Sequence, residues 1–110
     1  MANTFKNAAM ANVDNSAYDT LYTAPSGTQV VVLGLAIANK TTAAVSVQVQ
    51  FSDSSASTTH QLLENVSIPA NTTLETLAGQ KYILEAGDAL KVKAGTGSAI
   101  DVVMGVMEKS

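Results

Sequence analysis

Residues 30–38 read VVVLGLAIA, a run without a polar side chain. In a strand, alternate side chains point to opposite sides of the sheet. One face then carries the larger side chains, Val31, Leu33, Leu35 and Ile37. The other face carries smaller side chains, which decrease in size from valine to glycine and alanine: Val30, Val32, Gly34, Ala36 and Ala38. A strand at the surface of an antiparallel sheet normally keeps one face polar. We therefore expect both faces to be covered, one by the core and the other by an N-terminal segment or a neighbouring subunit.

Other segments also carry strand patterns. Residues 45–52, VSVQVQFS, alternate apolar and polar side chains, and residues 89–94 do the same. Residues 100–107 are apolar on both faces, like residues 30–38. We expect these two unusually apolar segments to lie near each other. Turn residues separate the runs, at positions 25–27, 69–71, 78–80, 86–88 and 95–98.

Turn signals spaced by about 8–12 residues are typical of an all-β sandwich or barrel. We predict an all-β fold: an antiparallel β-sandwich, Ig-like or jelly-roll-like, with seven to nine strands. A chain of 110 residues is expected to form a single domain, 1–110. Within it, residues 1–16 are expected to be an extended N-terminal arm or a strand, although the alanines of residues 4–13 would also suit a helix.

The composition excludes several kinds of partner. Charged residues make up 14% of the chain, against about 25% in typical proteins, and Ser, Thr, Asn and Gln replace them. The net charge is −3 and there is no Arg, so we expect no nucleic-acid partner. No apolar run approaches the roughly 20 residues that span a bilayer, so we expect no membrane partner. The first residues lack the apolar core of a secretory signal, and we expect no export.

Residues 53–60, DSSASTTH, hold the one cluster of Asp, Ser and His. Nucleophilic catalysis needs a base in contact with the nucleophile, and no nucleophile-elbow motif is present. The cluster is better explained as a polar loop between two strands. The carboxylates are dispersed and there is no Cys, so neither a calcium loop nor a thiolate metal site is indicated. We predict no catalytic, cofactor-binding or metal-binding residues, no cofactor, and no enzymatic activity.

Six segments, taken in order, resemble small virion structural proteins of tailed bacteriophages, especially phages of marine and cyanobacterial hosts. They are MANTFKNA (1–8), LYTAPSG (21–27), VVVLGLAIAN (30–39), FSDSSASTTHQLL (51–63), ILEAGDALKV (83–92) and AIDVVMGVMEKS (99–110). The resemblance implies a β-sandwich on the capsid or tail, present in many copies and without enzymatic activity. It implies a location in the virion after synthesis in the host cytoplasm.

Capsid decoration, in which a cement protein stabilises the particle through symmetric contacts, is the function we expect first. The alternatives are a neck, tail or fibre-base component, and a carbohydrate-binding module for host attachment. The scarcity of aromatic residues, 5% of the chain, weakens the last one. The expected partners are the protein itself, as a homo-oligomer, and other virion proteins, first the major capsid protein. The candidate interface is formed by Val32, Gly34, Ala36, Ala38, Val103 and Met107.

Overall fold

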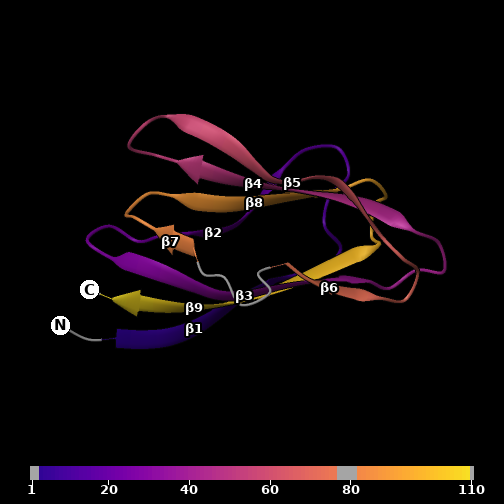
Figure 1. Cartoon of the computed structure of the whole chain (residues 1–110), viewed down its shortest axis with the longest axis horizontal. Helices are drawn as coiled ribbons and strands as arrows, with labels where there is room; N and C mark the ends of the chain where they lie inside the picture. The colour runs from indigo at the N-terminus through magenta and orange to yellow at the C-terminus, as the bar shows by residue number, and fades with distance from the viewer. Residues whose placement is uncertain (1–2, 77–81, 110) are drawn as a thin grey trace.

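The computed structural model describes residues 3–76 and 82–109, and over these residues it contains nine strands in two antiparallel sheets (Figure 1). The strands are β1 (Asn3–Met10), β2 (Asp19–Thr23), β3 (Gln29–Asn39), β4 (Val45–Asp53), β5 (Thr58–Ile68), β6 (Thr73–Glu75), β7 (Tyr82–Leu84), β8 (Ala89–Ala94) and β9 (Ile100–Lys109). The predicted all-β sandwich is confirmed, and β1 forms a strand within the segment expected to be an arm or a strand. The turn expected at residues 78–80 lies outside the described residues. No helix of the described part is long and apolar enough to cross a membrane.

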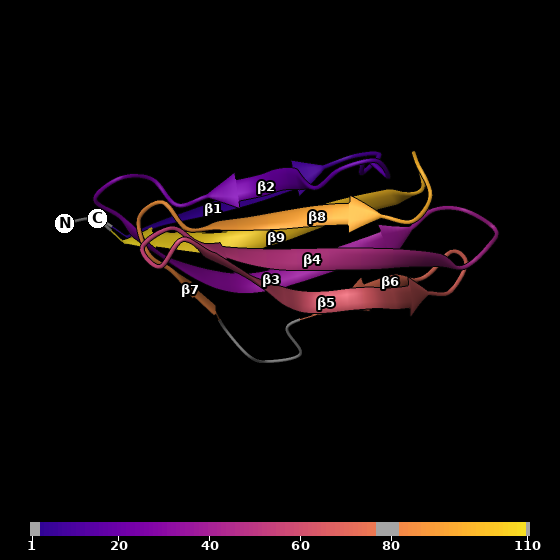
Figure 2. The same ribbon diagram turned by 90° about the horizontal axis from the view of Figure 1, so that it is seen from above.

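The strand order is that of a jelly roll. One sheet runs β1-β9-β3, with β6 and β7 both paired to β3, and the other runs β2-β8-β4-β5 (Figure 2). When β6 and β7 are counted as one interrupted strand, the chain pairs first with last and so on inward: β1 with β9, β2 with β8, β3 with β6 and β7, and β4 with β5. This is a long hairpin rolled into two layers, the double Greek key of jelly rolls. The two apolar segments do lie side by side, because β3 pairs with β9.

The core fills the space between the two sheets. Alternate side chains of β4 and β8 point inward from one sheet, and Val45, Val47, Val49, Leu90 and Val92 are all buried, as their alternation predicted. The opposite sheet contributes Val30, Val32, Leu35, Ile37, Ile100, Val102, Met104 and Val106. Full burial of such a side chain contributes about 1.5–3 kcal/mol, so this inward set is the main source of the fold's stability.

The alternation of β3 is interrupted by a bulge at Leu33. Val32 pairs with Val106 of β9 and Gly34 pairs with Gly105, so Leu33 is an extra residue without a partner. Bulges of this kind leave one residue unpaired and shift the alternation of the strand. Val30 and Val32 therefore point into the core before the bulge, and Leu35 and Ile37 point into it afterwards. The prediction that the strand keeps one face of large and one of small residues is wrong for this reason.

One open side of the sandwich is closed by a polar cluster between the two sheets. Lys6 of β1 forms an ion pair of 3.1 Å with Glu108 of β9, and the Tyr22 hydroxyl of β2 donates a hydrogen bond to the same carboxylate. The hydrogen bonds from Tyr22 and then from Lys6 lower the pKa of Glu108. Burial, followed by the contact with Glu108, raises the pKa of Tyr22, so its hydroxyl remains a donor.

Val47→Asp is expected to prevent folding, because it places an unpaired charge between the sheets at a cost of several kcal/mol against a stability of roughly 5–15 kcal/mol. The control is Gln50→Asp, three residues along the same strand, which lies beside Lys91 on the outer side. We expect its stability to change by no more than about 0.5 kcal/mol. Circular dichroism and urea unfolding measure both variants. Equal damage from the two would contradict the assignment of the faces of β4.

Acid is expected to destabilise the fold through the Glu108 cluster. The folded-state pKa of Glu108 lies below its ordinary value of 4.5, so the folded protein holds its proton less tightly than the unfolded chain. The stabilisation is then present above pH 4.5 and is lost as the pH falls through the lower folded value. Glu108→Gln should lessen the fall in the free energy of unfolding over this range. Urea titrations at several pH values test this, and identical pH profiles for the two proteins would contradict it.

Candidate functional site

The outer face of the β1-β9-β3 sheet carries a row of apolar side chains. Phe5 of β1 is in register with Met107 of β9, Met107 with Val31 of β3, and Val31 with Ile83 of β7. These four residues, here called the apolar row, cross the sheet from β1 to β7. Phe5 is 72% exposed and Ile83 is 53% exposed. The row is therefore a ridge of hydrophobic groups that faces away from the core.

A glycine trough lies directly beside this row. Gly105 of β9 pairs with Gly34 of β3, so neither of these two strands has a side chain at this point of the outer face, whereas Asn7 of β1, the other partner of Gly105, does. A Cβ added at Gly105 would meet open space among the described residues, and one added at Gly34 would lie 3.6 Å from Glu75 Oε1. On the other side of the trough, the exposed side chain of Val103 lies between Ala9 of β1 and Ala36 of β3. The face consists of a ridge, the glycine trough and a second, lower ridge.

Large exposed hydrophobic side chains gather on this one sheet. Within the described ranges there are four of them, Phe5, Leu33, Ile83 and Val103, and all belong to β1, β3, β7 and β9. The outer face of the other sheet is polar, with Thr20, Gln50, Gln61 and Lys91 on neighbouring strands. A contiguous apolar patch with a polar border marks an interaction surface. This face is therefore the candidate interaction surface of the described part of the chain.

The structure places five of the six predicted interface residues together. Gly34, Ala36, Ala38, Val103 and Met107 lie on the outer face of the β1-β9-β3 sheet. Val32 does not, because the bulge at Leu33 turns it into the core, where it is 0% exposed. Its prediction as an interface residue is wrong.

Sequence reasoning missed Phe5, Leu33 and Ile83 on this face. Phe5 alternates with Asn7 and Ala9, which is a usable signal once residues 3–10 are recognised as a strand. Ile83 lies in a strand of only three residues with apolar neighbours on both sides, so its direction depends on its pairing with Val31. Leu33 was assigned to the face of larger side chains, which was expected to meet the core; it lies on the same side of β3 as Val31, and that side faces outward.

The charges at the far border of the face are paired. Lys40 forms an ion pair of 2.9 Å with Asp101 and a hydrogen bond of 2.6 Å with the Asn12 side chain. The pKa of Asp101 is lowered, first by the hydrogen bond from the Asn12 backbone amide and then by Lys40. The apolar row contains no charged residue, but the exposed Glu75 of β6 is in register with Ala36, and its carboxylate lies 3.6 Å from the position of a Cβ on Gly34. Covering the whole face would therefore also desolvate the Glu75 carboxylate, which accepts a hydrogen bond from the Leu35 amide.

The polar face of the β2-β8-β4-β5 sheet holds a network of side chains. Tyr18 donates a hydrogen bond of 2.8 Å to Gln48, and Gln48 donates to Asn65 at 2.8 Å and to Glu64 at 3.2 Å. A polar pocket of about 170 Å³ lies here, with Lys93 in its wall. Asn65 adopts a φ of 51°, an unusual value within a strand. A carbohydrate-binding module, the alternative that the scarcity of aromatic residues weakens, would use amide and aromatic groups of this kind.

The Asp-Ser-His loop is occupied by its own turn. Asp53 accepts hydrogen bonds from the Ser55 hydroxyl and amide and from the Ala56 amide, and these contacts, first that of the Ser55 side chain, lower its pKa. The exposed His60 ring contacts Thr58 at 3.2 Å. The arrangement is that of a turn stabilised by its aspartate. Within residues 3–76 and 82–109, no three His, Asp or Glu side chains gather as metal ligands would.

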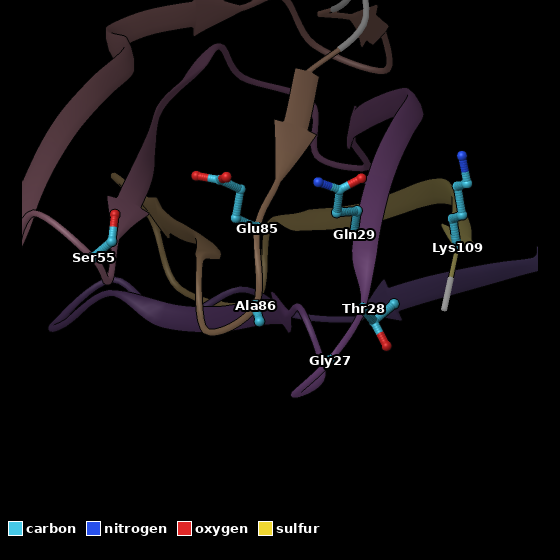
Figure 3. Close-up of a pocket in the computed structure, with 7 residues that line it drawn as sticks. All are labelled: Gly27, Thr28, Gln29, Ser55, Glu85, Ala86 and Lys109. Carbon is cyan, nitrogen blue, oxygen red and sulfur yellow. The ribbon is translucent and has the colours of Figure 1, made fainter. Parts of the chain in front are cut away.

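A shallow, open pocket of about 490 Å³ lies at the end of the sandwich (Figure 3). It is lined by Gly27, Thr28, Gln29, Ser55, Glu85, Ala86 and Lys109. In the figure, Gln29 lies between Glu85 and Lys109, and the carboxylate and the ammonium point away from each other. No hydrogen bond or ion pair of the described residues joins two lining side chains. The lining therefore offers isolated polar groups and not a nucleophile with its base.

The bulge that shapes the apolar face is secured by residues at the end of β6. The backbone amide of Leu35 donates to the Glu75 carboxylate at 3.1 Å, and the Leu35 carbonyl accepts from the Thr76 amide at 3.0 Å. β7 pairs with residues 30–32 and β6 with residues 36–38, so neither strand reaches the bulge itself. The Glu75 side chain therefore replaces a backbone partner that the sheet does not supply.

Glu75→Ala is expected to cost about 1–3 kcal/mol of stability, because it leaves the Leu35 amide without a hydrogen-bond acceptor. Glu75→Gln retains an oxygen acceptor in a side chain of the same length and should cost less. Urea unfolding of the two variants and the parent protein tests this. If Glu75→Ala is as stable as Glu75→Gln, the carboxylate does not hold the bulge.

No family model matches the chain, and no curated protein matches its sequence. Among solved structures, it is similar to a chain of the Bacillus endospore appendages, which are disulfide-linked pili. That match has a TM-score of 0.51 and 11% identity, and covers 96% of this chain and 85% of the other. A second match, to the structure of infectious bursal disease virus Gx strain, has a TM-score of 0.45 and 6% identity, and covers 96% of this chain and 37% of that chain. At these identities the likeness to the appendage chain is one of fold: the protein is a β-sandwich similar in fold to a pilus protein.

Proposed function

We propose that this protein is a non-enzymatic structural protein of a phage virion, attached to the capsid as a decoration or cement protein. The observation that carries the proposal is the apolar outer face of the β1-β9-β3 sheet, where Phe5, Ile83 and Val103 are more than half exposed. A surface of this kind is suited to burial in an assembly. Its partners would be further copies of the chain and the major capsid protein, and its location the virion, after synthesis in the host cytoplasm.

Two further observations support an assembly role. The six segments that resemble small virion proteins extend from residue 1 to residue 110 in order. The fold is also similar to that of a protein that forms pili, so this sandwich architecture is compatible with a polymer subunit. Those pili are disulfide-linked, whereas this chain contains no Cys. Its contacts with neighbours would therefore not be disulfide bonds, and we expect them to depend on the apolar face.

The main alternative is a neck, tail or fibre-base component, which would use the same apolar face in a smaller assembly. A carbohydrate-binding module for host attachment is the second alternative. The Tyr18–Gln48–Asn65 network favours it, because amides and an aromatic ring are groups that recognise sugars. These amides already bind one another and Glu64, however, which leaves them less free for a ligand.

Copy number in purified particles tests the proposal. Quantitative mass spectrometry gives the ratio of this protein to the major capsid protein. A decoration protein is expected in hundreds of copies per particle, since the capsid surface repeats its lattice positions. A few to dozens of copies would assign it to the neck or tail. Absence from the particle would contradict a virion role altogether.

A further inference from the structure

Three side chains from separate elements meet at one end of the β1-β9-β3 sheet, and we propose that two of them react with each other. Asn12 follows β1, Lys40 follows β3, and Asp101 belongs to β9, which lies between those strands. The Lys40 amine attacks the Asn12 side-chain amide and forms an isopeptide bond between Nζ and Cγ. Asp101 carries the proton, and ammonia leaves. This modification occurs within one chain and is independent of the proposed virion role.

The distance between the reacting groups is the first argument. Lys40 Nζ lies 2.6 Å from Asn12 Oδ1. Because a carbonyl bond is about 1.2 Å long, Asn12 Cγ lies within about 3.8 Å of the amine. Reacting atoms about 3–3.5 Å apart are close to an attack geometry, and groups held in this way react with effective molarities of about 10⁵–10⁸ M. The amine therefore reaches the carbon through a small side-chain movement.

The backbone holds both residues against the start of β9. The amide of Lys40 donates a hydrogen bond to the Ala99 carbonyl at 3.0 Å, and the amide of Val13 donates to the Ile100 carbonyl at 2.9 Å. The Val13 side chain is buried, which anchors the chain directly after Asn12. Asn12 has a φ of 57°, in the left-handed region where Asn is enriched. The two reacting side chains are thus attached to neighbouring points of one strand.

Asp101 provides the proton acceptor that the amine needs. Its Oδ1 lies 2.9 Å from Lys40 Nζ and accepts a hydrogen bond from the Asn12 backbone amide at 3.0 Å. An ammonium must lose a proton before it attacks, and a carboxylate in contact with it can take that proton and pass it to the leaving nitrogen. The hydrogen bond from the Asn12 amide, and then that from Lys40, lower the pKa of Asp101. Proton transfer to Asp101 is therefore uphill, and the reaction is slow.

Atoms and charges balance without a further reactant. The new bond joins Lys40 Nζ to Asn12 Cγ, and the bond between Cγ and Nδ2 of Asn12 breaks. The Lys40 ammonium gives up two protons, and both end on the departing nitrogen, which is released as ammonium. The side chains of Lys40 and Asp101 are 42% and 39% exposed, so the ammonium escapes into water. The protein loses one positive charge, and nothing is oxidised or reduced.

The cross-link fastens the exposed edge strand of the sheet. β1 is exposed over most of its length, and of its side chains only Ala8 and Met10 pack against the core. A bond between residues 12 and 40 ties the end of β1 to the end of β3 across β9. It also closes a loop that contains β2 and β3, and such closure restricts the unfolded chain as a disulfide does. A protein without Cys thereby gains a covalent brace.

Mass spectrometry of the purified full chain tests the inference. The cross-linked protein should be lighter than its sequence by one ammonia, about 17 Da. The chain has no Arg, so trypsin cuts it after Lys alone. Cleavage after Lys40 should be lost, whereas cleavage after Lys6, whose ammonium contacts the Glu108 carboxylate and not an amide, should continue.

Two results would overturn the inference. One is a full sequence mass, with complete cleavage after Lys40, after prolonged incubation of the folded protein. The other is the loss of ammonia with Lys40 still cleaved, because a succinimide formed at an asparagine has the same mass but leaves the lysine free.

Two variants assign the roles within the trio. Lys40→Arg is the matched control, because a guanidinium keeps the positive charge but stays protonated and does not act as an amine nucleophile. It should retain its full sequence mass and be cut by trypsin at position 40. Asp101→Asn keeps the shape of the side chain without the base and should slow bond formation by about 100-fold or more. Circular dichroism checks that both variants fold. Loss of ammonia in Lys40→Arg would overturn the inference, and an unchanged rate in Asp101→Asn would overturn the role of Asp101.

Discussion

The pairing of β3 with β9 is the constraint on which the rest of the structure depends. Both strands are apolar on two sides, and they lie next to each other in the middle of one sheet. Their inward residues, such as Ile37 and Val102, supply much of the core, and their outward residues form the candidate interface. β1 extends the same sheet on one side, and β6 and β7 extend it on the other. The same pair of strands therefore contributes both to the core and to the surface that we propose for assembly.

Much of the fold follows from local patterns in the sequence. Strict alternation in residues 45–52 fixes which side of β4 is inward, because the strand is half buried and its polar residues need water. The double apolar character of residues 30–38 and 100–107 correctly indicates that these segments are neighbours. The jelly-roll order does not follow from these patterns, because it depends on which distant strands pair and not on the periodicity of any one strand.

The details of the candidate site were less predictable. The bulge at Leu33 arises from the register between β3 and β9, so no pattern within residues 30–38 reveals that Val32 and Gly34 point to opposite sides. Register shifts between β4 and β5, near Asn65 with its positive φ, likewise leave both Leu62 and Leu63 packed against the core. The predicted side-chain directions were therefore wrong where the strand pairing is irregular. At such positions the pairing with a neighbouring strand, and not the local sequence, sets the direction of a side chain.

The bulge also has a consequence for how such a surface can change during evolution. Without Leu33, the remaining residues of β3 would alternate regularly: Val30, Val32, Leu35 and Ile37 inward, and Val31, Gly34 and Ala36 outward. The core therefore does not need this residue, whereas a bulge increases the local twist of the sheet that carries it. Gain or loss of a single codon at this position would alter the curvature of the outer surface and preserve the interior pattern. Lineages of this protein could thus acquire new packing angles between neighbours through length variation alone.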